Sequence, residues 1–182
     1  GPFFCLGLVL ASDPEDASLT DVTIHRLCVQ ERDELSMFLA AGRHIEVFRK
    51  KAEEAGKPLP VTINMGLDPA IYIGACFEAP TTPFGYNELG VAGALRQAPV
   101  ELVQGVAVNE KAIARAEIII EGELLPGVRV EEDQHTHTGH AMPEFPGYCG
   151  EANPSLPVIK VKAVTMRHQA ILQTLVGPGE EH

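Results

Sequence analysis

Side chains that could do chemistry are concentrated in one stretch, EDQHTHTGHAMPEFPGYCG, at positions 132–150. Its nitrogen and sulfur ligands are His135, His137, His140 and Cys149. These atoms could bind zinc, but their spacing matches no recognised structural zinc motif. A metal site, a catalytic loop and a polar connection between two strands are therefore all open interpretations of this stretch.

Glu144 has different surroundings from the other acids of this stretch, because it lies in MPEFPGY, between two prolines and beside a phenylalanine. A carboxyl group in apolar, stiff surroundings can keep its proton near neutral pH and act as a general acid. An exposed loop acid without a catalytic role is the alternative.

Arg26 lies in DVTIHRLCV, whose β-branched residues predict a strand. Strict alternation along a strand would place on one face Val22, Ile24, Arg26 and Cys28. Burying a guanidinium among apolar neighbours is very costly unless an anion pairs with it. The expected partner of Arg26 is either a structural carboxylate or the carboxylate or phosphate of a ligand.

Three residues, Asp21, His44 and Glu88, could form a metal site if the fold brings them together. Arg43 and His44 lie at a predicted strand-to-helix junction, where free backbone N–H groups favour anions. Glu88 lies in the first turn of another predicted helix, where its simplest role is to compensate the helix dipole. Asp21, His44 and Glu88 together would offer a hard, oxygen-rich site for Mn²⁺ or Mg²⁺ that bridges to a phosphate.

The composition limits what the whole chain can do. Its 182 residues suffice for one domain with one buried core. The formal net charge of −11 opposes binding to nucleic acid, and no long basic run offsets it. The longest strongly apolar run, residues 3–11, is far shorter than the roughly 20 residues that span a bilayer. No basic segment precedes this run as in a signal peptide. We therefore predict a cytoplasmic protein without nucleic-acid or membrane partners.

The cysteines are widely spaced, which favours reduced thiols over a disulfide framework. They are Cys5, Cys28, Cys76 and Cys149. The chain begins without Met, directly in an apolar segment, so we expect it to be a piece of a longer protein.

The elements that must position these residues can be read from hydrophobic periodicity and turn residues. Strands are predicted over residues 3–11, 21–30, 34–40, 58–66, 99–108, 115–124 and 158–166, and helices over 43–56, 68–77 and 87–96. About six strands with two or three helices predict an α+β domain, with a strongly curved or barrel-like sheet. Glu117, Glu121 and Glu123 alternate along one strand and are expected on a solvated or partly solvated face.

Several motifs occur together in a specific order: DVTIHRL, GRH, NELGVAGALR, PVELVQ, AEIIIEGELLPGVR, PEFPGY and VIKVKAVTMR. As a set they resemble the UbiD family of prenylated-FMN-dependent decarboxylases, over nearly all of the chain. The first 30 residues and the histidine-rich stretch look most similar to its bacterial protocatechuate (3,4-dihydroxybenzoate) decarboxylase branch.

This resemblance implies a fold and a reaction. The fold would be an α+β split β-barrel of the FMN-binding, flavin-reductase-like type with a few flanking helices. Residues 1–182 would be a single prenylated-FMN-binding central domain of a longer, homo-oligomeric enzyme. The reaction would be the non-oxidative decarboxylation of a small aromatic carboxylate, protocatechuate to catechol. Gallate, 4-hydroxybenzoate and vanillate are alternative substrates, and a flavin- and metal-binding module that is inactive on its own is the alternative function.

The resemblance also assigns residues. The cofactor contacts would be Ile24, His25, Arg26, Phe38, Leu39, Ala40, Arg43 and His44. The ligands of Mn²⁺ or Mg²⁺, often found with K⁺, would be Asp21, His44 and Glu88, with Asp21 in place of the usual Asn. The catalytic residues would be Arg26 and Glu144.

One feature departs from the family pattern. Most relatives carry two acids five residues apart that flank the substrate, and Glu144 matches the later one. Gly139 and His140 occupy the region of the earlier acid in a longer loop. The resemblance therefore suggests that His135, His137 or His140 takes part in its place.

Overall fold

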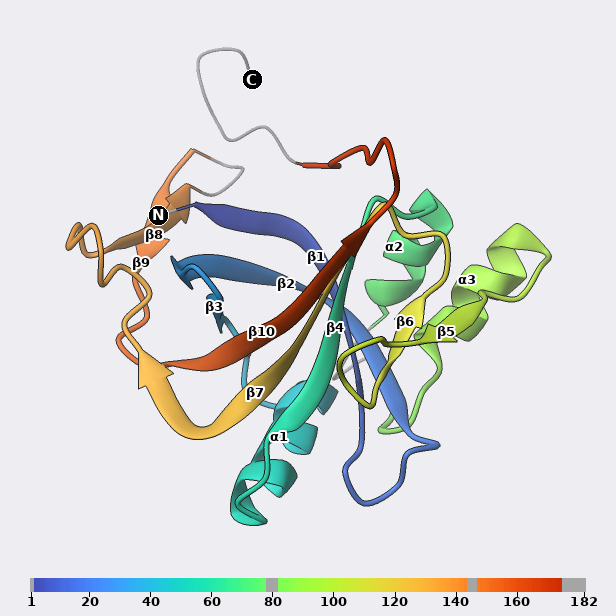
Figure 1. Ribbon diagram of the computed structural model, residues 1–182, viewed down its shortest axis with the longest axis horizontal. Helices are drawn as coiled ribbons and strands as arrows, with labels where there is room; N and C mark the ends of the chain where they lie inside the picture. The colour runs from blue at the N-terminus through green and yellow to red at the C-terminus, as the bar shows by residue number, and fades with distance from the viewer. Residues whose placement is uncertain (1, 78–81, 144–146, 175–182) are drawn as a thin grey trace.

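The computed structural model describes residues 2–77, 82–143 and 147–174, and their centre is a closed antiparallel barrel (Figure 1). Each strand pairs with its neighbours in the order β1 (Phe3–Ser12), β2 (Thr20–Glu31), β3 (Glu34–Met37), β10 (Leu156–Met166), β7 (Ile118–Val130) and β4 (Leu59–Met65), and β4 pairs again with β1. The α+β barrel expected from the sequence is confirmed.

The barrel closes around alternating apolar side chains, because successive residues of a strand point to opposite faces. Its interior contains Val9, Leu27, Ile63, Ile120 and Ile159. Helix α1 (His44–Glu54) packs against this core through Ile45, Phe48 and Ala52, which follow helical spacing. The first residue of α1 is thereby held beside the barrel.

A helix pair covers the outer face of β1 and β2. Helices α2 (Pro69–Ala75) and α3 (Glu88–Arg96) pack against each other and against Leu8, Leu10 and Val22 (Figure 1). Their starts were predictable, because the side chains of Asp68 and Asn87 accept hydrogen bonds from first-turn backbone N–H groups.

The pair is closely packed at Gly74 of α2. A Cβ atom at this position would lie only 2.6 Å from the carbonyl oxygen of Glu88. Glycine therefore sets how closely the start of α3 approaches α2.

The expectation that Glu121 lies on a solvated face is wrong. Strands β5 (Leu102–Gln104) and β6 (Lys111–Ile113) form a hairpin over this part of the barrel, and Glu121 is 2% exposed. Its carboxylate accepts hydrogen bonds from the backbone N–H groups of Val106, Ala107 and Val108. The predicted strand 99–108 is correspondingly short, because its second half is the turn that Glu121 holds.

A second ribbon, β8 (His140–Pro143) with β9 (Cys149–Glu151), follows the long strand β7 and precedes β10. Among the described residues, no helix is long and apolar enough to cross a membrane. Within the part of the chain that the structure describes, none of the four cysteines forms a disulfide, as their spacing predicts.

Candidate functional site

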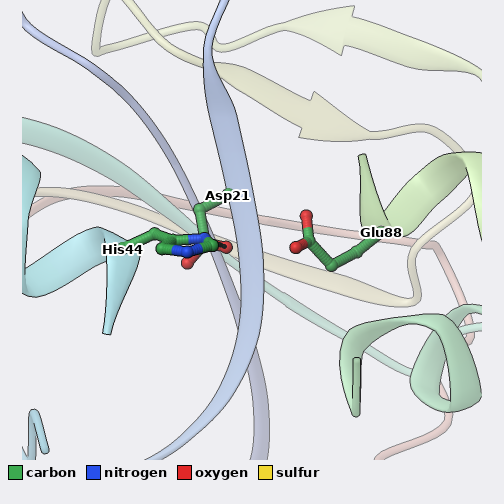
Figure 2. Close-up of side chains that lie close together, drawn as sticks. All are labelled: Asp21, His44 and Glu88. Atoms are coloured by element: carbon green, nitrogen blue, oxygen red, sulfur yellow. Dashed lines mark ion pairs between the residues drawn. The ribbon is translucent and has the colours of Figure 1, made fainter. Parts of the chain in front are cut away.

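The three predicted metal ligands lie together. One ligand atom of each of Asp21, His44 and Glu88 lies within 4.8 Å of the others, and all three residues are buried. Figure 2 shows Asp21 on its strand between the other two, with His44 reaching in from α1 and the Glu88 carboxylate from the start of α3. Nδ1 of His44 lies 3.4 Å from Oδ1 of Asp21. The fold thus supplies the convergence that sequence spacing alone does not show.

The electrostatics of this cluster suit a cation. Burial, and after it the negative charge of Asp21, raises the pKa of Glu88 to about 8. Oε1 of Glu88 is buried and has no hydrogen-bond partner among the described residues. A divalent cation would neutralise both carboxylates and bind this oxygen. Two carboxylates and one imidazole are a donor set that suits Mn²⁺ or Mg²⁺, so these residues fit the expected ion.

Neighbouring side chains orient the ligands. The hydroxyl of Thr23 donates a 2.6 Å hydrogen bond to Oδ2 of Asp21. The ring of Phe84 meets the imidazole of His44 edge-on, with the ring centroids 5.4 Å apart. Because Phe84 lies only four residues before Glu88, the segment that leads into α3 also contacts α1. Phe84 therefore connects the segment before Glu88 to His44.

A small cavity collects most of the predicted cofactor contacts. Its lining is Ile24, His25, Arg26, Phe38, Ala40 and Arg43. Leu39 instead packs against the barrel core, and His44 belongs to the metal cluster. The cavity measures about 80 Å³, whereas small-molecule sites usually measure roughly 300 Å³ or more. The described residues that line it thus form a cavity wall and do not enclose a space of that size.

His25 on this wall is held as a neutral imidazole. Burial lowers its pKa to about 4, although the carbonyl of Phe38, 3.0 Å from Nδ1, acts in the opposite direction. Since that carbonyl can only accept, Nδ1 carries the proton and Nε2 is left as an acceptor. Nε2 is buried without a partner among the described residues, so it can accept a hydrogen bond from a ligand in the cavity.

Arg26 has the anionic partner that its apolar surroundings require. Its Nε and Nη2 donate hydrogen bonds of 2.7 and 2.9 Å to the two carboxylate oxygens of Glu132. The guanidinium also lies over the ring of Phe38, 4.3 Å from its centroid. Because Arg26 lines the cavity, this bidentate pair fixes a positive charge at the place where a ligand would bind.

Glu132 is the functional residue that sequence reasoning missed. Its side chain is 1% exposed, and the backbone N–H of Asn153 donates a further 3.0 Å hydrogen bond to it. Gly139 is the residue five positions before Glu144, whereas Glu132 lies twelve positions before it, so the family spacing does not point to Glu132. Within the described residues the carboxylate of Glu132 binds Arg26 from the chain segment where the earlier acid is expected. Glu144 itself lies outside the described residues.

Comparison with known proteins decides the family. A family model for the 3-octaprenyl-4-hydroxybenzoate carboxy-lyase Rift-related domain, UbiD, matches residues 1–180. The chain belongs to the UbiD family. The gallate decarboxylase of Lactiplantibacillus plantarum is 58% identical over 183 residues, which cover 100% of this chain and 37% of the relative. The chain therefore spans little more than a third of the length of this UbiD relative.

Solved structures superpose on all or nearly all of the chain. The apo 3,4-dihydroxybenzoic acid decarboxylase from Enterobacter cloacae is 96% identical with a TM-score of 0.91, covering 100% of this chain and 37% of that one. The UbiD-class enzyme HmfF from Pelotomaculum thermopropionicum, in an evolved dimeric form with prFMN, is 38% identical with a TM-score of 0.86, covering 97% of this chain and 38% of that one. A flavoredoxin of Desulfovibrio vulgaris, 13% identical with a TM-score of 0.55, shares only the fold, which confirms the flavin-reductase-like barrel.

The histidine-rich stretch of this UbiD chain forms no metal site among the described residues, where Asp21, His44 and Glu88 are the only such group. The ring of His135 instead bonds the backbone carbonyl of Gln30 and lies 3.6 Å from Glu31. The stretch is therefore a connection docked on the end of β2, and the zinc interpretation gains no support.

Proposed function

We propose that this chain is the central, cofactor-binding domain of a longer enzyme that removes CO₂ from a hydroxybenzoate, converting protocatechuate to catechol with prenylated FMN. The observation that carries this proposal is the 96% identity, over the whole chain, to a 3,4-dihydroxybenzoic acid decarboxylase. The family membership, the Arg26–Glu132 pair and the metal cluster support it.

The metal cluster would anchor the cofactor. Asp21, His44 and Glu88 would hold Mn²⁺ or Mg²⁺, and the ion would bind the phosphate of the flavin, with K⁺ as an expected companion. Arg43, which precedes the first residue of α1 and lines the cavity, would face the same phosphate. Ile24 and the neutral imidazole of His25 would contact the flavin from β2.

Two residues would act directly on the substrate. When bound, prenylated FMN supplies the electrophile and electron sink that the decarboxylation needs. Arg26, fixed by Glu132 on one edge and by Phe38 on one face, would orient the aromatic carboxylate. Glu144 would then donate a proton to the carbon that has lost CO₂.

The test is turnover by the full-length protein that contains this chain, loaded with prenylated FMN and Mn²⁺. We expect catechol to form from protocatechuate, detected by liquid chromatography. Glu144→Gln should abolish decarboxylation and exchange of the ring proton while the flavin stays bound. Full activity of that variant would remove Glu144 from the mechanism, and absence of any hydroxybenzoate turnover by the unaltered protein would contradict the proposed function.

Gallate is the second candidate substrate, because the 58% identical relative is a gallate decarboxylase. Gallate differs from protocatechuate by one additional ring hydroxyl, so both place a hydroxyl where it activates the reacting carbon. Comparing kcat/KM for protocatechuate, gallate, 4-hydroxybenzoate and vanillate in the same preparation ranks these alternatives.

A further inference from the structure

Gln30 is a buried polar residue at an irregular point of the barrel. It lies near the end of β2 and is 4% exposed. The pairing of β2 with β3 shifts register between Val29 and Glu31, so Gln30 falls at a bulge. A bulged residue leaves the ladder, which frees its backbone groups and redirects its side chain.

The side chain and the backbone of Gln30 both bind the segment that carries Glu132. The side-chain amide Nε2 donates to the backbone carbonyl of Glu132 at 3.2 Å and to the hydroxyl of Ser36 at 2.8 Å. Its Oε1 accepts a 2.9 Å hydrogen bond from the side chain of Gln134. Its backbone carbonyl, freed by the bulge, accepts the ring N–H of His135.

These contacts surround the residue that fixes Arg26. Gln30 binds the backbone carbonyl of Glu132, the side chain of Gln134 and the ring of His135. Glu132 has a second anchor, because its backbone N–H donates to the carbonyl of Asn153 at 2.8 Å. Since a displaced carboxylate would lose its bidentate geometry with Arg26, the position of this segment decides how the guanidinium is held.

We propose that Gln30 is a positioning residue of the reaction, which latches segment 131–135 onto β2 and so fixes the Glu132 carboxylate against Arg26. The effect of Gln30 on turnover rests on the proposed function, whereas its role in holding segment 131–135 on β2, which we call the latch, does not. This gives the histidine-rich stretch a structural role. The ring of His135 bonds the backbone carbonyl of Gln30, and the side chain of Gln134 bonds the side chain of Gln30.

A double-mutant cycle in the full-length enzyme tests whether Gln30 acts through Glu132. Gln30→Met keeps the volume and removes the amide. We expect kcat for protocatechuate to fall about tenfold, about 1.4 kcal/mol, with flavin and metal content unchanged. In a Glu132→Ala background the same substitution should change kcat by less than about twofold. An equal loss in both backgrounds would overturn the proposal.

Hydrogen–deuterium exchange of the same proteins measures how firmly segment 131–135 is held on β2, and the measurement does not depend on turnover. We expect amides of segment 131–137 to exchange at least about tenfold faster in Gln30→Met. Thr62→Val is the matched control, since Thr62 is fully buried and its hydroxyl donates to the carbonyl of Lys111, outside this network. It should leave this segment protected. Unchanged exchange in Gln30→Met refutes the latch, and a protein without decarboxylase activity refutes only the proposed function.

Discussion

Glu132 is suited to hold the guanidinium of Arg26 in place. Its two oxygens accept three hydrogen bonds, two from Arg26 and one from the backbone of Asn153, and the side chain is 1% exposed. A carboxylate bound in this way is fixed in position, because each of its oxygens has a donor. Glu132 thus serves as a support for Arg26, and the acid proposed as proton donor is a different one, Glu144.

Removing Glu132 should therefore disable Arg26. In the full-length enzyme we expect Glu132→Ala to lower kcat about 100-fold, about 2.7 kcal/mol, because the guanidinium loses its bidentate support. Steady-state kinetics measure this, with flavin absorbance as the check on loading. Glu123→Ala is the matched control, since Glu123 forms only a partly exposed ion pair with Lys162. Similar losses in the two variants would contradict the role of Glu132.

His25 should make the stability of the chain depend on pH. Burial lowers its pKa to about 4 from the ordinary 6.5, so between these values the unfolded chain binds a proton that the folded chain does not. The contribution is complete above pH 6.5 and decreases as the pH falls through this window, by on the order of 3 kcal/mol. Urea unfolding at pH 7 and pH 4.5 measures it.

The control for this prediction is His25→Asn, which keeps a donor for the carbonyl of Phe38 and cannot titrate. Its free energy of unfolding should fall less between the two pH values than that of the unaltered chain. The same pH dependence in both proteins would mean that other groups, rather than His25, are responsible.

At the scale of elements, the contact between α2 and α3 should set metal affinity. Gly74→Ala would place a methyl group 2.6 Å from the carbonyl of Glu88, so α3 must shift and move this ligand. We expect Mn²⁺ to bind at least about tenfold more weakly, measured by paramagnetic resonance of free Mn²⁺. Gly90→Ala is the control, because its nearest neighbouring atom would lie 3.5 Å away. Equal affinity of both variants would exclude this packing as a determinant.

The elements that sequence predicts well are those with local causes. Asp68 and Asn87 mark the starts of α2 and α3 because a cap bonds N–H groups two or three residues away. The partner of Arg26 is 106 residues away, so no local pattern points to Glu132. Asp21, His44 and Glu88 have suitable side chains in the sequence, but only the packing of α1 and α3 on the barrel brings them together.

The buried position of Glu121 was missed for a related reason. Alternation along β7 correctly places it on the outer face of the barrel, but alternation does not tell what covers that face. The β5–β6 hairpin does so, and its turn supplies three backbone donors to the carboxylate. A buried acid that satisfies a turn is indistinguishable, in sequence, from an exposed acid on a strand.

At the scale of the molecule, a chain that forms only part of a substrate site should bind metal without catalysing turnover. The chain spans 37% of the length of the gallate decarboxylase and of the 3,4-dihydroxybenzoic acid decarboxylase that it resembles, and its cavity measures only about 80 Å³. We expect the 182-residue chain to bind Mn²⁺ and to form no catechol from protocatechuate, whereas the full-length protein forms it. Metal titration and product analysis of both proteins test this, and turnover by the chain alone would contradict it.

The double anchoring of Glu132 has a consequence for how this enzyme can vary. Its backbone is tied to Asn153 on one side and to Gln30 on the other, so its place does not depend on the number of residues that follow. Insertions or deletions within 136–139 would change the exposed surface of this loop without moving the charge that holds Arg26. The length of this loop can therefore change while the Arg26–Glu132 pair stays in place.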